Sequence, residues 1–366
     1  MDCTANDFQV AVEAGNHKVR YQNERQFQSQ EQAKGQYGQQ SDFISNKKES
    51  VTRDATKNDN QTEVTDFILL GFQIKENHNF LVYSIILVIY CSTVCGNLLI
   101  IILTLCSKTL QSPMYFFLSQ LSANDIFLTN VIVPNMLNIL LNNGGAITFI
   151  GCMIQFYCFG SSETFECFLL TLMSYDRYLA ICRPLHYSGI MNRPLCIKLV
   201  TVSLILTLFI VLIDTLTVSK LQFCRSNIID HFFCDLDPLL ELSCSDTFMI
   251  RLEVFLLSTP IILIPSFIII ISYIYIILAI LKIQSKDGRQ KTFSTCSSHL
   301  SVVIIFYGTL FCIYILPKRG QTVNINKLLS LVYTVVTPLL NPIIYGLRSQ
   351  EIKKALRKTV SQICSK

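Results

Sequence analysis

The 366-residue sequence contains no tryptophan and few charged residues. Charged side chains make up 15% of the chain and hydrophobic ones 51%, whereas soluble domains carry about 25% charged residues. Residues 1–60 hold 17 of the 55 charges, which leaves 38 for the other 306 residues. A chain so poor in charge cannot cover a surface that faces water, which excludes a cytosolic enzyme, a nucleic-acid-binding protein and a disordered protein.

Several catalytic and targeting patterns are also absent. The sequence has no Gly-rich phosphate loop, and no metal-spaced partner follows His299. It has no internal repeat, although repeated halves are common in secondary transporters. No apolar run follows Met1, so a secretory signal peptide is not expected and the first span would act as signal anchor. An enzyme is therefore a weak interpretation, and a transporter or channel is the alternative from another class.

Residues 1–60 differ from the rest of the chain. They include nine Gln, have a net charge of −1 and lack an apolar run. Such a segment cannot bury enough surface to offset chain entropy, so we expect a disordered extension. The Gln-rich stretch 22–40 leaves a partner-binding tail as an alternative. Asn60-Gln61-Thr62 is an acceptor sequence for N-glycosylation if this part of the chain is extracellular.

Seven apolar runs follow, and each is of the length that crosses a membrane. A bilayer core of about 30 Å requires about 20 apolar residues in a helix. We therefore predict an all-α membrane protein with a seven-transmembrane helix bundle over residues 61–348. A basic tail over 349–366 is expected to include a short amphipathic helix after the seventh span. The runs are Phe80–Leu105, Pro113–Leu141, Cys152–Ile181, Ile197–Val218, Val254–Leu281, Leu300–Leu316 and Leu328–Leu347.

Basic residues in the short loops predict the orientation. Fifteen Lys and Arg residues fall on the side of the C-terminus and six on the other side. The positive-inside rule thus places the N-terminus outside and the C-terminus inside. Four cysteines then lie in an oxidising compartment, which indicates two disulfides with three alternative pairings. They are Cys152, Cys224, Cys234 and Cys244.

Ionisable side chains within spans are costly and usually functional. Asp125 lies in the second span, Glu163 and Glu166 lie in the third, and Asp214 lies near the outer end of the fourth. Asp125 and Glu166 would repel each other if both were ionised. Either one of them is protonated, or a small cation such as sodium lies between them. Prolines and glycines within the spans indicate bent helices around a cavity, which favours binding or switching over anchoring.

From Asn60 to Lys358 the chain resembles the vertebrate odorant receptors, a group of rhodopsin-like G-protein-coupled receptors. Each signature is short, but all occur together and in order. They are Phe67–Phe72, Gly96-Asn97, Pro113–Ser119 with Asp125, Met173–Cys182 with Pro184–Tyr187, His231–Asp235, Leu242–Asp246, Ser272-Tyr273, Lys291–Leu300 and Pro338–Tyr345. The departures are Gln111-Ser112, Ser174 and Thr292. Family members usually begin close to the acceptor sequence, so residues 1–60 are either a true tail or a gene-model artefact.

The resemblance implies a receptor of the plasma membrane, surrounded by lipid, that catalyses no reaction. It implies that a small-molecule odorant binds within the bundle and that a heterotrimeric stimulatory G protein of the olfactory type is activated, which raises cyclic AMP. Nucleic acid is not an expected partner. The pattern around Tyr175 and Leu185–Tyr187 is similar to the tetrapod-type class. A chemosensory receptor expressed outside the nose is the alternative within this family.

The resemblance also implies roles for particular residues. It pairs Cys152 with Cys234 and Cys224 with Cys244, whereas the rival interpretation makes His231 and Cys234 a copper or zinc pair. It assigns a cation site to Asp125 and Glu166. In the resting state Asp176 would hold Arg177 by a charge-assisted hydrogen bond. The residues expected to act in G-protein activation are Asp176, Arg177, Tyr178, Tyr273, Tyr307, Asn341, Pro342 and Tyr345.

Candidate odorant contacts follow from helical turns counted along the spans, and each of them has helix packing as its alternative. Glu163 is the unusual member, because it is either an anion for an amine ligand or a protonated carboxyl group bonded to a neighbouring span. A pocket of mostly apolar residues with a few polar anchors is typical of small-molecule sites. The candidates are Phe159, Gly160, Glu163, Thr164, Leu257, Ser258, Ile261, Phe311, Tyr314, Leu331 and Thr334.

Overall fold

The computed structural model describes residues 65–72, 76–223, 227–314 and 323–364. The predicted extension over residues 1–60, including the acceptor Asn60, lies outside the described residues. Cys224 also lies outside them.

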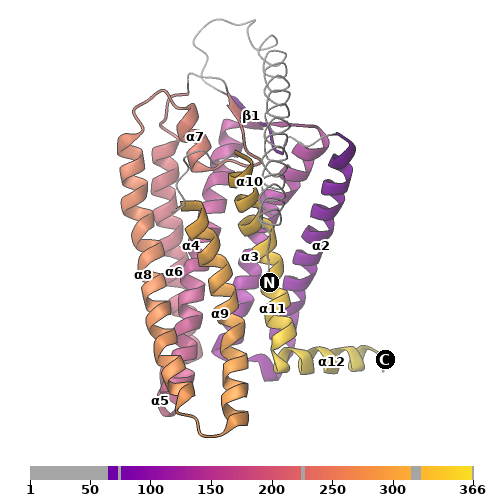
Figure 1. The fold of residues 1–366 in the computed structure, drawn as a ribbon, viewed down its shortest axis with the longest axis vertical. Helices are drawn as coiled ribbons and strands as arrows, with labels where there is room; N and C mark the ends of the chain where they lie inside the picture. Colours follow the sequence, from indigo (N-terminus) through magenta and orange to yellow (C-terminus); the bar gives the residue numbers. More distant parts are fainter. Residues whose placement is uncertain (1–64, 73–75, 224–226, 315–322, 365–366) are drawn as a thin grey trace, which may run out of the picture. The chain divides into compact units, whose positions relative to one another are not determined.

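In the described residues, seven long helical segments run between the two ends of a bundle (Figure 1). The predicted apolar runs fall on these segments in order, so the predicted seven-helix bundle is confirmed. The segments are α2 (Glu76–Cys106), α3 (Pro113–Leu141), α4 (Phe149–Cys182), α6 (Arg193–Val218), α8 (Phe248–Leu281), α9 (Lys286–Tyr314) and the stretch of α10 (Val323–Leu331), the π-helical turn η2 (Val332–Val336) and α11 (Thr337–Arg348).

Composition accounts directly for five of these segments. Within the described residues, α2, α3, α6, α8 and the α10–α11 stretch are long and apolar enough to cross a membrane. The 34-residue α4 is long enough at about 1.5 Å per residue, but it carries Glu163, Glu166 and Asp176. The apolar part of α9 is the shorter Cys296–Cys312. The polar groups of α4 are tolerated because this helix packs against α3, α6, α8 and α9, away from the lipid.

A small three-stranded sheet covers one end of the bundle, which we call the sheet end (Figure 1). β1 (Asp66–Leu69) pairs antiparallel with β2 (Gly145–Thr148) and parallel with β3 (Ile228–Ile229). The short helix α7 (Leu236–Leu242) packs against β3. These strands were not predicted, because runs of two to four residues beside apolar spans carry too little pattern.

The opposite end, which we call the Arg177 end, carries short helices. They include the 3-10 turn η1 (Lys108–Leu110), α5 (Pro184–Ile190) and α12 (Gln350–Cys364). Figure 1 shows α12 turning sharply from the end of α11 and running outward from this end of the bundle. Ile352 and Ala355 of α12 are buried, whereas Lys354 and Arg357 are exposed. The predicted amphipathic helix after the seventh span is therefore α12.

Candidate ligand and signalling sites

A disulfide ties the sheet end to the central helix. Cys152, in the first turn of α4, is bonded to Cys234, which lies just before α7, 82 residues further along the chain. Gln155 supports this connection: its Oε1 accepts a hydrogen bond from the Cys234 N–H at 3.0 Å, and its Nε2 donates to the carbonyl of Val131 on α3 at 3.1 Å. Cys244 is disulfide-bonded as well.

The disulfide also bears on the rival metal interpretation. A sulfur that is bonded to another sulfur cannot serve as a thiolate ligand, so His231 and Cys234 do not form a copper or zinc pair here. Across the described residues, no group of three or more His, Cys, Asp or Glu side chains is arranged to hold a metal ion.

Lys327, one of the six basic residues in the loops on the side opposite the C-terminus, forms a second connection at the sheet end. Its side chain is 1% exposed. The ammonium group donates to the carbonyl oxygen of Gly71 at 2.8 Å and to Oδ1 of Asp230 at 2.5 Å. One lysine near the start of the seventh segment thus joins the residues after β1 to those after β3. Only the partners in space, which lie far away in the sequence, reveal this role.

His231 lies in the same region and is buried between aromatic rings. Its imidazole stacks on Phe232 and meets Phe233 edge-on, with centroid distances of 4.6 Å in both cases. Burial, together with the nearby Lys327 ammonium, lowers the pKa of His231 to about 3. The imidazole is therefore neutral at physiological pH and belongs to the packed sheet end.

Halfway along the bundle, polar side chains link α3 and α11. The Asn341 amide donates to both carboxylate oxygens of Asp125, at 3.0 and 3.2 Å. Close packing supports this contact, because a Cβ added to Gly96 of α2 would lie 3.2 Å from Pro342. The sequence analysis named Asp125, Asn341 and Pro342, and the structure brings them to one level of the bundle.

The cation site expected at Asp125 and Glu166 has suitable donors. Glu166 Oε1 and Asn341 Oδ1 are buried and have no hydrogen-bond partner among the described residues. Buried oxygens without partners are costly, and a small hard cation takes oxygen ligands of this kind. The residues present therefore fit a sodium ion.

At the Arg177 end, a buried carboxylate holds the expected arginine. Asp176 is fully buried and accepts hydrogen bonds from the Arg177 guanidinium at 2.5 and 3.0 Å. Its other oxygen accepts from the Tyr187 hydroxyl of α5 at 2.8 Å. Burial beside the Asp176 carboxylate raises the pKa of Tyr187 above its ordinary value, so this hydroxyl stays protonated and donates. Tyr187 was not predicted as a partner of Asp176, because the apolar runs do not indicate the short helix α5.

The remaining candidate switching residues lie on α4, α8, α9 and α11. The Tyr273 hydroxyl is 2.6 Å from Nδ1 of His299, which connects α8 to α9. The Tyr178 ring packs edge-on against Tyr275 with centroids 5.9 Å apart. Tyr307 is half-buried beside Phe306, and Tyr345 is buried.

The candidate odorant contacts differ from one another in burial and in the residues they touch. Phe159 is buried against Phe233 and Tyr333, at centroid distances of 4.9 and 5.6 Å. Gly160 faces α6, because a Cβ at this position would lie 3.0 Å from Val211. Glu163 Oε2 is buried and has no hydrogen-bond partner among the described residues.

The other candidates range from buried to exposed. The hydroxyl of Thr334 donates to its own helix, at the carbonyl of Ser330, over 2.7 Å. Phe311 is 55% exposed, and the side chain of Tyr314 lies outside the described part of the structure. The half-buried members are Thr164, Leu257, Ser258, Ile261 and Leu331.

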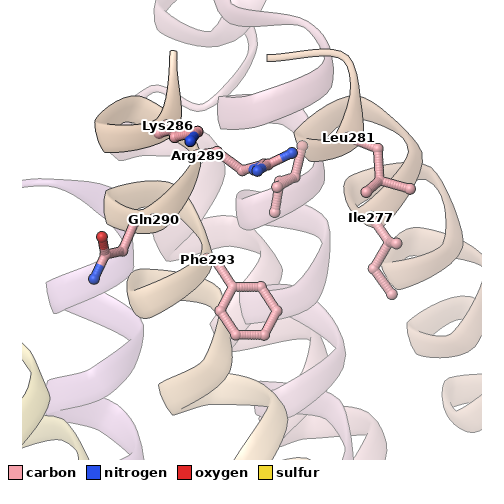
Figure 2. A pocket seen from close by; sticks show the side chains of 7 residues that line it. Ile277, Leu281, Lys286, Arg289, Gln290 and Phe293 are labelled. Atoms are coloured by element: carbon pink, nitrogen blue, oxygen red, sulfur yellow. The ribbon is translucent and has the colours of Figure 1, made fainter. Parts of the chain in front are cut away.

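A groove of about 400 Å³ lies elsewhere, between α8 and α9 at the Arg177 end. Figure 2 shows Arg289 extending from α9 toward α8, with the Phe293 ring one turn further along. None of its lining residues is among the candidate odorant contacts, so this groove is a separate feature. The lining residues are Ile277, Ile280, Leu281, Lys286, Arg289, Gln290 and Phe293.

Known proteins are similar to this sequence over most of its length. A family profile described as "Olfactory receptor" matches residues 86–363. Olfactory receptor 11L1 of Homo sapiens is 46% identical over 305 residues, which cover 83% of this chain and 95% of that protein. Olfactory receptor 1468 of Rattus norvegicus is 44% identical over 308 residues, 84% of this chain and 97% of that protein. Olfactory receptor 5G9 of Mus musculus is 44% identical over 304 residues, with shares of 83% and 97%. The chain belongs to the olfactory receptor family.

Proposed function

We propose that this odorant receptor lies in the plasma membrane with its sheet end outside and its Arg177 end inside. As a member of its family it is a multi-pass membrane protein that binds odorants and couples to a G protein, and it is not an enzyme. Two features support the orientation. The loops at the Arg177 end carry the excess of Lys and Arg, and the disulfide at the sheet end suits an oxidising compartment.

The contact between Arg177 and Asp176 is the observation that supports our proposal for signalling. Arg177 is held by the buried Asp176, which is also bonded to Tyr187. An arginine in such a contact becomes available to another protein once the contact opens. An odorant that binds the open arrangement more tightly shifts the population toward it. We infer that the open receptor activates a stimulatory G protein and raises cyclic AMP, with the switching residues named above relaying the movement.

The odorant site is proposed among the candidate residues of α4, α8, α9 and the seventh segment. Phe159 and Glu163 are one helical turn apart on α4, and they offer an aromatic surface and a carboxyl oxygen without a partner among the described residues. That oxygen is either an anion for an amine ligand or part of a protonated carboxyl group. An amine panel tested on the wild type and on Glu163→Gln separates these alternatives, because unchanged responses in the variant would rule out the amine.

We further propose that sodium bound near Asp125 and Glu166 stabilises the resting arrangement. The carboxylate and amide oxygens of Asp125, Glu166 and Asn341 would hold the ion, which would offset the repulsion between the two acids. Replacing choline chloride with sodium chloride should raise the melting temperature of the wild-type receptor. An equal rise in Asp125→Asn would contradict this site.

The segment 1–60 is proposed as an extracellular extension before the receptor domain, with a glycan on Asn60. Enzymatic removal of N-linked glycans should increase the gel mobility of the wild type and leave Asn60→Gln unchanged. Equal mobility shifts in both proteins would place the glycan elsewhere.

An odorant panel with a cyclic AMP reporter tests the proposed signalling. Arg177→Ala should abolish the odorant-dependent rise in cyclic AMP while surface display persists. Arg183→Ala, which removes the same charge from an exposed position nearby, should keep most of the response. An odorant-gated current in cells without any G protein would instead support the channel alternative. Transcript location distinguishes an olfactory role from a chemosensory role elsewhere.

A further inference from the structure

The groove between α8 and α9 combines apolar walls with cations. Ile277 and Leu281 approach from α8, and Phe293 approaches from α9 (Figure 2). All three are large apolar side chains exposed at the surface of the bundle. Lys286 and Arg289 lie nearer the tip of the α8–α9 turn than Phe293 does, since α9 begins at Lys286. The groove is thus apolar toward the middle of the bundle and cationic toward its end.

Neither cation is neutralised by a partner in the described structure. Lys286 and Arg289 are exposed, and the ion pairs of the described residues involve other side chains. Asp287, in the first turn of α9, is exposed and does not line the groove. Two cations that converge on one space without a carboxylate indicate an anionic ligand. Arginine in particular bonds phosphate oxygens in pairs.

The position of the groove indicates where that anion comes from. α8 crosses the membrane and ends at Leu281, so the groove lies at the level where a span meets the headgroups. A phospholipid has the same order of polarity, with a phosphate at the surface and acyl chains toward the middle. Basic pockets between spans on the cytoplasmic side are suited to anionic headgroups.

Size and lining favour a lipid over a protein partner. The groove measures about 400 Å³, which lies within the range of about 300–1,000 Å³ for small-molecule sites. A protein partner usually buries about 800 Å² on each side. No lining residue comes from α4, the helix that carries Arg177.

We propose that this groove binds one anionic phospholipid of the cytoplasmic leaflet. Arg289 and Lys286 hold its phosphate, and an acyl chain lies against Phe293, Ile277 and Leu281. The proposal rests on the orientation proposed above. Because the lipid touches both α8 and α9, it occupies a surface that changes when these helices separate.

Native mass spectrometry of the purified full-length receptor, titrated with phosphatidylserine, tests this site without odorant or G protein. Each juxtamembrane cation contributes about 1 kcal/mol to anionic-lipid binding. The double variant Lys286→Ala/Arg289→Ala should therefore bind phosphatidylserine about thirtyfold more weakly. The control Lys108→Ala/Lys282→Ala removes two exposed charges at the same end, outside the groove lining, and should bind as the wild type does. Phe293→Ser should weaken binding severalfold, because it removes the apolar wall.

Three outcomes would overturn the proposal. Equal weakening in both double variants would mean a general surface charge. Displacement of the lipid by inorganic phosphate at the same concentration would mean that only an anion is recognised. Unchanged lipid binding in the groove variants, with lost G-protein activation, would make the groove a protein contact. Melting temperatures close to that of the wild type show that the variants are folded, and the cyclic AMP assay reports separately on the receptor function.

Discussion

The two ends of the bundle are held together by different kinds of contact. At the sheet end, partners lie far apart in the sequence: 82 residues separate Cys152 from Cys234, and 256 separate Lys327 from Gly71. At the Arg177 end, Asp176 and Arg177 are adjacent, and Tyr187 lies 11 residues from Asp176. The first set includes a covalent bond and a buried ammonium, whereas the second consists of an ion pair and a hydrogen bond to the same carboxylate.

This difference indicates which end of the bundle is a rigid frame, meaning that its contacts hold the helices fixed, and which end can change its arrangement. Contacts that close long loops restrict the chain strongly, and breaking them exposes buried groups. The contacts of Asp176 can open and close without separating distant segments. We therefore expect the sheet end to hold the helix ends next to it in place while the Arg177 end changes its arrangement.

Removal of the disulfide should have the largest effect on stability. In Cys152→Ser/Cys234→Ser the link between α4 and the segment before α7 is lost, which typically costs about 2–5 kcal/mol. Surface display and the melting temperature should both fall sharply. Cys158→Ser changes a free cysteine on the same helix and should retain both. Normal display of the disulfide variant would contradict the view of the sheet end as a frame.

The Lys327 contact should show an asymmetry between its two partners. Asp230→Ala leaves a buried ammonium with only the Gly71 carbonyl, and stranding a buried charge costs about 3–5 kcal/mol. Asp230 is 46% exposed, so we expect about 2–3 kcal/mol after allowance for solvent. Lys327→Met should cost less, because its aliphatic chain still fills the space and Asp230 can reach water. The double variant should be more stable than Asp230→Ala alone, which thermal unfolding would measure; additive losses would contradict the coupling.

Acidification should loosen the sheet end through His231. Its pKa is about 3 in the folded receptor and about 6.5 in an unfolded chain. Between these values the unfolded state binds more protons, so stability falls as the pH drops below about 6.5. The loss amounts to about 2 kcal/mol at pH 5. The fall in melting temperature between pH 7.5 and pH 5 should be larger in the wild type than in His231→Gln. An equal pH dependence in both proteins would exclude His231 as the cause.

Loss of the Tyr187 hydroxyl should have the smallest effect and should appear in signalling rather than in stability. Tyr187→Phe removes one hydrogen bond to Asp176, worth about 1 kcal/mol. If this contact stabilises the resting state, the basal cyclic AMP level per receptor at the surface should rise by up to about fivefold. Tyr275→Phe removes a hydroxyl from an exposed tyrosine and keeps its ring contact with Tyr178, so its basal level should match the wild type. A basal level that does not change in Tyr187→Phe would show that this bond does not hold the resting state.

Much of the bundle could be predicted, because a membrane span is recognised from the apolar residues of one continuous stretch of sequence. Seven apolar runs identified the seven helical segments, even where α4 carries acids and α9 has a short apolar part. The signature residues also predicted which side chains meet, as with Cys152 and Cys234, or Asp176 and Arg177. These predictions came from the resemblance and not from spacing, which left three cysteine pairings open.

Other features could not be predicted, because they depend on distant segments. Its position on a helical turn of α4 made Gly160 a candidate ligand contact. In the structure Gly160 faces α6, and Val211 fills the space beside it. β1 is strand-like only because β2 and β3 supply its hydrogen-bond partners. The α8–α9 groove arises from two helices that meet at a turn, and no local pattern marks it.

The sequence by itself determined that this chain is a seven-span receptor, since apolar length and short motifs are local properties that persist in any arrangement of the helices. The tertiary structure decided which polar groups are partners. From the sequence alone, Lys327 is expected to be an exposed loop cation. In the fold its side chain is buried and joins two segments, because Gly71 and Asp230, which lie 256 and 97 residues away in the sequence, both contact it. A buried charge is tolerated only where such partners converge, and convergence is a property of the packed bundle alone.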